Sequence, residues 1–194
     1  EETARRAKFI YINYPNNPTG AVATKAFYEK LVAWAKTYEV GVVSDLAYGA
    51  LGYQGYENPS FLSTPGAKDV GIEFYTFSKT FNMAGWRLAF AAGNDQMIED
   101  LNLIQDHLFV GIFPALQEAG IAALLDPKSE EAVAQLNATY DSRRDAFVQA
   151  AAKIGWQAFP SRGSFYAWMP VPEGYTSESF ADLLLEKVHV AVAP

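Results

Sequence analysis

Short apolar runs alternate with one amphipathic segment through the first half of this sequence, and this order constrains the fold more than any other feature. The runs cover residues 8–13, 40–44, 71–77 and 87–93. After Thr24, a residue type that caps helices, apolar side chains recur at helical spacing, at Phe27, Leu31, Trp34 and Tyr38. Strand, helix, strand, loop, strand is typical of a mostly parallel α/β sheet. We therefore predict an α/β fold.

Polar residues follow three of the predicted strands. Asn17 lies in the loop after the first strand, Asp45 follows the second, and Lys79 follows the third. Parallel sheets of this kind bind ligands at the carboxyl ends of their strands. We therefore expect Asn17, Asp45 and Lys79 to converge on one site.

The second half of the sequence is more helical. Two helices are expected at 95–108 and 114–125, and a long one starts in the run DPKSEE, with an Asp or Ser cap, and ends at Gly155. The buried side of the long helix is expected to carry Val133, Leu136, Tyr140, Phe147 and Ile154.

The last forty residues predict a smaller α+β unit. The stretches WQAF and FYAWM, on either side of the turn PSRGS, suggest a hairpin, and a helix at 177–187 and a strand at 188–193 follow. We therefore divide the chain into a large domain, residues 1–126, and a small domain, residues 127–194, joined through the long helix.

Composition narrows the classes of partner. A net charge of −7 and a pI near 4.8 argue against a nucleic-acid or anionic-membrane surface, which would need a concentrated basic face. The absence of cysteine excludes disulfides, thiolate catalysis and Cys-based zinc sites. No apolar run is long enough to cross a membrane. We expect small-molecule partners and a cytoplasmic protein.

A lysine at a strand end fits three kinds of chemistry. A phosphate-binding P-loop needs G-x-x-x-x-G-K-S/T, and the segment FYTFSKT lacks both glycines. A serine site of the β-lactamase type needs Ser-x-x-Lys, but Thr76 occupies the serine position before Lys79. The third chemistry is a Schiff base between the lysine and a carbonyl group.

Several motifs together fit the third chemistry. In this order, NNPTG, SDLAY and TFSKT, with Arg87 after six more residues, resemble the large domain of the class I/II aminotransferases, which are pyridoxal-phosphate (PLP) enzymes of fold type I. PSRGSFYAW and VHVAVAP are similar to the small domain of that family, so the resemblance covers essentially the whole chain. It implies an incomplete PLP-binding large domain followed by part of the small domain.

The resemblance implies roles for four residues around the ring of PLP. Lys79 matches the lysine that holds PLP as a Schiff base and then moves a proton between the substrate and the cofactor. Asp45 matches the carboxylate that pairs with the pyridine nitrogen and keeps it protonated. Tyr48 and Asn17 match the phenol and the amide that hydrogen-bond the cofactor's O3′.

The resemblance also implies a phosphate site. Thr76, Ser78 and Arg87 match its two hydroxyls and its guanidinium, whose planar fork suits a phosphate. Other polar residues receive no such role. We interpret Arg143 and Arg144 as the solvated face of the long helix.

The implied activity is the transfer of an amino group between an amino acid and a 2-oxo acid, in a homodimer. One alternative is a PLP-dependent C–S β-lyase, which shares SKTFN and AG but usually lacks a pair like Trp86 and Arg87. Another is a PLP-sensing domain of a transcription regulator. The chain is read as a middle fragment, because the family's chains extend beyond both of its ends, and we expect the fragment alone to be inactive.

Overall fold

A four-stranded sheet forms the centre of the first half of the molecule in a computed structural model that describes residues 2–194. The strands lie in the order β1 (Phe9–Asn13), β2 (Gly41–Asp45), β3 (Gly71–Thr76) and β4 (Ala89–Gly93). The first three are parallel and β4 is antiparallel to β3. The predicted α/β class with a mostly parallel sheet is confirmed.

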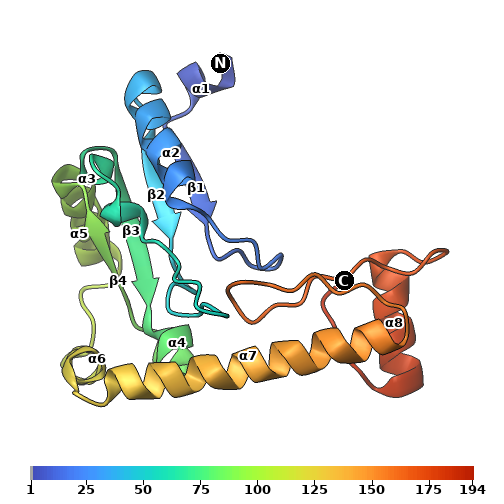
Figure 1. Cartoon of the computed structure of the whole chain (residues 1–194). Helices are drawn as coiled ribbons and strands as arrows, with labels where there is room; N and C mark the ends of the chain where they lie inside the picture. Colours follow the sequence, from blue (N-terminus) through green and yellow to red (C-terminus); the bar gives the residue numbers. More distant parts are fainter. Residues whose placement is uncertain (1) are drawn as a thin grey trace.

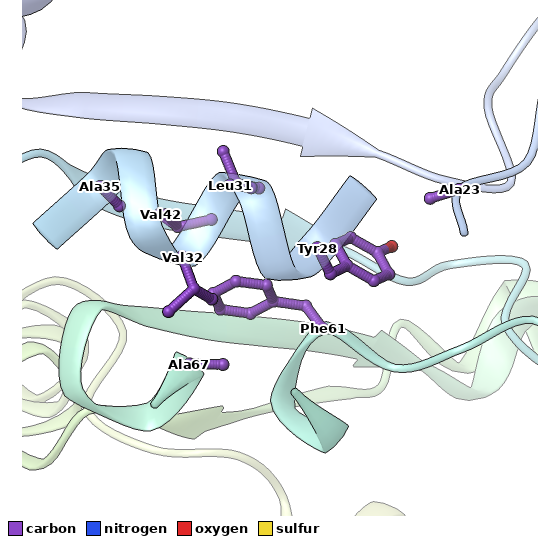
Figure 2. Close-up of a cluster of buried hydrophobic side chains, with 8 residues drawn as sticks. All are labelled: Ala23, Tyr28, Leu31, Val32, Ala35, Val42, Phe61 and Ala67. Atoms are coloured by element: carbon purple, nitrogen blue, oxygen red, sulfur yellow. The ribbon is translucent and has the colours of Figure 1, made fainter. Parts of the chain in front are cut away.

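Helix α2 (Lys25–Tyr38) connects β1 to β2 and covers one face of the sheet (Figure 1). It begins as predicted, because the Thr24 hydroxyl accepts a hydrogen bond from the Phe27 amide at 3.1 Å. Its buried side packs on β2 and on Phe61, as Figure 2 shows. The cluster consists of Ala23, Tyr28, Leu31, Val32, Ala35, Val42, Phe61 and Ala67. This packing fixes the strands whose ends carry the polar residues.

A buried carboxylate, Glu73 of β3, ties the sheet to the segment that precedes β3. It accepts hydrogen bonds from the Ser44 hydroxyl at 3.0 Å, from the Phe61 amide at 2.8 Å and from the Ser60 hydroxyl. Only 6% of Glu73 is exposed. A buried charge is tolerated when several donors satisfy it, so this group is structural.

Changing Glu73 to glutamine is expected to lower the free energy of unfolding of the full-length protein by about 2 kcal/mol. The reason is that an amide group would turn an N–H toward donors that now face carboxylate oxygens. Urea denaturation measures the change. Glu57→Gln, at an exposed position, is the matched control and should stay within about 0.5 kcal/mol of the original protein. Equal losses in the two variants would contradict a buried network at Glu73.

The remaining helices lie beside and beyond the sheet. The long ones are α5 (Asp95–Leu108), α6 (Pro114–Leu125), α7 (Ser129–Lys153) and α8 (Ser177–Val188). The short ones are α1 (Glu2–Arg6), α3 (Ala67–Val70), α4 (Phe77–Thr80) and the 3-10 turns Phe61–Ser63 and Ala84–Trp86. Figure 1 shows α7 running past the ends of the strands toward α8. Among residues 2–194 no helix is long and apolar enough for a membrane crossing.

Two predictions of strands are wrong. Neither side of the expected hairpin forms a strand, and the only pairing there is an isolated bridge between Gly52 and Gly163. Residues 189–194 follow α8 without regular structure. A strand needs a neighbour for its backbone groups, and the described part of the chain places no strand beside either stretch.

Two details of α7 also differ from the prediction. Its N-cap is Lys128, whose side chain makes no capping bond, although the Asp126 carboxylate accepts from the Lys128 amide at 2.8 Å. Phe147 is 43% exposed and Ile154 is 75% exposed, so the predicted buried stripe does not extend to the end of the helix. The buried position in this last part of α7 is Ala151, which is 6% exposed.

Candidate active site

Asn13, the last residue of β1, connects two of the predicted site segments. Its side-chain amide donates to the backbone oxygen of Asp45 at 3.1 Å. Its side-chain oxygen accepts from the backbone amide of Asn17 at 2.8 Å. The loop that carries Asn17 is thereby held against the end of β2. Asn13 was not among the predicted site residues: its place at a strand end marks it as a candidate, but its two contacts depend on the register of β1 on β2.

Asp45 is the final residue of β2 and is paired in register with Asn13 and Phe74. Its carboxylate accepts a hydrogen bond from the Ala47 amide at 3.1 Å and remains exposed to solvent. This bond fixes the start of the turn that leads to Tyr48. The carboxylate can therefore pair with a cationic group of a ligand at this edge of the sheet.

Two aromatic rings lie beside the amine of Lys79. Its Nζ atom lies 5.9 Å from the ring centre of Tyr48 and 5.3 Å from that of Phe165. Lys79 itself is in α4, the short helical turn that follows β3. Phe165 lies far along the chain, after α7, and had no predicted role. The rings shield one side of the amine from water.

The hydroxyl of Tyr48 lies 3.1 Å from the hydroxyl of Tyr166. Only 4% of Tyr48 is exposed, and its ring meets those of Phe165 and Tyr166 edge to face. Burial raises the pKa of Tyr48 above its usual range, and the negative charge of Asp45 raises it further. Tyr48 is therefore a neutral phenol at physiological pH and can donate a hydrogen bond.

The candidate phosphate residues lie where β3 ends and β4 begins. Thr76 caps α4, since its hydroxyl oxygen accepts from the Ser78 amide at 3.2 Å, and it also lies 3.0 Å from the Ser78 hydroxyl. The residue after Arg87, Leu88, is held at the end of β3, because its backbone oxygen accepts a hydrogen bond from the Phe77 amide at 3.2 Å. The Arg87 guanidinium is exposed and donates to the Ala84 oxygen at 3.0 Å. Both hydroxyls and the guanidinium are thus at one end of the sheet.

Arg144 is not a solvated residue, and that interpretation of the sequence is wrong. Only 10% of its side chain is exposed, and it pairs with Asp141 at 2.6 Å. It also donates to the Ser161 oxygen at 3.2 Å and lies 5.0 Å from the ring centre of Tyr53. The side of α7 that carries Arg144 faces the loop after the helix, whereas the adjacent Arg143 is exposed as predicted.

Comparison with known proteins identifies the family. The family described as aminotransferase class I and II matches residues 1–194. The chain belongs to this family. The resemblance seen in NNPTG, SDLAY and TFSKT is therefore confirmed over the whole chain.

Individual class I/II aminotransferases are closely similar. L-glutamine--4-(methylsulfanyl)-2-oxobutanoate aminotransferase of Bacillus subtilis is 57% identical over 192 residues, which are 99% of this chain and 48% of that protein. LL-diaminopimelate aminotransferase of Moorella thermoacetica is 48% identical over all of this chain and 49% of its own length. The chain spans about half the length of the curated relatives it matches.

A solved structure of the same family supports the fold. The substrate-bound structure of BacF from Bacillus subtilis superposes with a TM-score of 0.95 at 46% identity, covering 100% of this chain and 49% of BacF. The residues of the site described above thus lie in a fold that superposes on about half of BacF.

Proposed function

We propose that this chain is part of a PLP-dependent aminotransferase that moves an amino group between an amino acid and a 2-oxo acid. The observation that carries the proposal is the placement of Lys79 beside Tyr48, at the sheet edge where β2 ends in Asp45, in a chain that matches the family over its full length. The relatives described above are named as aminotransferases, which supports transfer over lyase chemistry or a regulatory domain.

The residues present fit PLP by the chemistry of their donors and acceptors. Lys79 offers an amine for the aldehyde, Asp45 a carboxylate for the ring nitrogen, and the neutral Tyr48 a donor for the phenolic oxygen. Asn17 adds an amide on the loop held by Asn13. The phosphate would be held by Thr76, Ser78 and Arg87. Hydroxyls and a guanidinium suit its negative charge.

When bound, PLP supplies an electron sink that stabilises negative charge on the substrate's α-carbon. The residues of this chain would bind and orient the cofactor and would move the substrate's protons. Lys79 would hold the cofactor through its amine and would take up and return the proton of the substrate's α-carbon, as a positioned general base does. Asp45 would keep the ring nitrogen positively charged through an ion pair. The rings of Tyr48 and Phe165 would exclude water from one side of the Lys79 amine.

We also propose the division into a large domain, residues 1–126, and a small domain, residues 127–194, and assembly of the whole protein as a homodimer. In the structure the sheet and its covering helices precede residue 126, and α7 begins three residues later. Cytoplasmic localisation stays a prediction.

Product analysis of the purified full-length protein tests the proposed function. With PLP and a panel of donors that includes aspartate, alanine, aromatic amino acids, diaminopimelate and glutamine, we expect a new amino acid to form only when a 2-oxo acid is added. Cystathionine is added to the panel as a lyase substrate: pyruvate, ammonia and a thiol formed from it without an acceptor would establish a lyase instead, and no turnover with any donor would favour a sensor. Residues 1–194 alone are expected to be inactive in the same assay.

A further inference from the structure

Tyr166 has no part in the proposed chemistry, yet it reaches the site from a distant segment. Its hydroxyl and that of Tyr48 are separated by 3.1 Å, across 118 positions of sequence. Tyr166 is only partly buried, whereas Tyr48 is almost fully enclosed. Because Tyr48 is almost fully buried, water has little access to it, and Tyr166 is the hydrogen-bond partner that the structure provides.

The loop that carries Tyr166 is fixed against the large domain. The Ser164 amide donates to the Leu51 oxygen at 3.3 Å, and the Tyr53 amide donates to the Arg162 oxygen at 3.1 Å. The Tyr53 hydroxyl also donates to the Ser164 oxygen. These bonds join two short segments. Residues 51–53 follow Tyr48 closely, and residues 162–164 come just before Tyr166. The position of Tyr166 is thus set by the backbone.

The hydrogen-bonding capacity of the two phenols decides what this contact can do. A phenol has one proton to donate and can accept a second bond at its oxygen. If Tyr166 donates to Tyr48, then Tyr48 keeps its own proton for another acceptor. If Tyr48 donates to Tyr166, it has no proton left for a ligand. The first arrangement is the one compatible with a phenolic oxygen of a ligand bound beside Lys79.

We propose that Tyr166 is a positioning residue that donates its hydroxyl proton to the Tyr48 oxygen and so directs the Tyr48 proton toward the cofactor's phenolic oxygen. This inference rests on the proposed function. Hydrogen bonds in such a chain polarise and strengthen one another, so the bond from Tyr48 to the cofactor is stronger when Tyr166 donates. The loop of the small domain thereby contributes to binding at the large domain.

Binding of PLP to four forms of the full-length protein tests this proposal: the original protein, Tyr166→Phe, Tyr48→Phe and the double variant. The dissociation constant of PLP is measured by quenching of tryptophan fluorescence, and the absorption spectrum of bound PLP is recorded. We expect Tyr166→Phe to weaken binding roughly two- to tenfold, the effect of one hydrogen bond, and to shift the absorption maximum in the same direction as Tyr48→Phe. In the Tyr48→Phe background, Tyr166→Phe should change neither quantity, since its effect passes through the Tyr48 hydroxyl.

Tyr175→Phe is the matched control, because Tyr175 packs on Phe180 beside α8 and has no contact with Tyr48. It should bind PLP as the original protein does. Additive effects of the Tyr48 and Tyr166 changes, or unaltered binding and spectrum in Tyr166→Phe, would overturn the positioning role while the proposed function stands. Failure of the original protein to bind PLP at all would overturn the proposed function, and this inference with it.

Discussion

Changing Lys79 to alanine in the full-length protein is expected to abolish transamination. The alanine variant has no amine to bond with the cofactor and no base to move the proton of the α-carbon. Each role of this kind contributes a large part of the barrier reduction, and each 1.4 kcal/mol lost is about tenfold in rate. Without both roles, the rate of amino-group transfer from an amino acid to a 2-oxo acid should equal the rate measured without enzyme.

Lys30→Ala is the matched control for this variant. Lys30 is an exposed residue of α2, on the helix that packs against the sheet. Its loss should leave the rate unchanged within about twofold, because exposed substitutions away from the site have small effects. A Lys79→Ala protein that retains a substantial fraction of the original rate would contradict the assignment, since no other described amine lies in this aromatic enclosure.

The second large effect is expected for Asp45→Asn. An ion pair at about 4 Å with an effective dielectric near 20 is worth roughly 4 kcal/mol, so losing it can cost about a thousandfold in kcat. The amide keeps the shape of the side chain and can keep the bond from the Ala47 amide. PLP should therefore still bind through Lys79 and the phosphate residues, and the fall should appear in kcat more than in retention of the cofactor.

Steady-state kinetics and PLP content, measured on the same preparation, check this expectation. Asp106→Asn, at an exposed position of α5, is the control for removing one negative charge from the protein and should behave normally. An Asp45→Asn rate within a few-fold of the original would show that the carboxylate does not set the charge of the ring. Loss of PLP together with the rate would instead assign Asp45 to binding.

The sequence predicts the first half of the fold well because its signals are local. The alternation of apolar runs places β1 to β4, and the Thr24 cap and helical spacing place α2. The expected hairpin and last strand failed because a strand depends on a neighbour that a local pattern does not reveal. The burial of Arg144 could not be predicted from the pattern of α7 either, because the loop that covers Arg144 follows the helix in the sequence.

The candidate site shows the same division. The positions of Lys79, Asp45 and Asn17 after strand ends could be predicted, because the apolar runs and short motifs mark those ends in the sequence. The contacts of Tyr166 and Phe165 could not, because they join segments more than eighty positions apart through tertiary hydrogen bonds and packing. Nor does any local signal show that Asn13 supports Asn17 and Asp45, since that requires the register of β1 on β2.

Borohydride reduction of the PLP-loaded full-length protein, followed by peptide mass mapping, tests the central claim most directly. Reduction converts a carbon–nitrogen double bond between a lysine and the cofactor into a stable single bond. We predict that the cofactor's mass is found on one peptide, the one that contains FYTFSKT, with Lys79 as the modified residue. A modification located on any other lysine, or a label that persists in Lys79→Ala, would contradict the account.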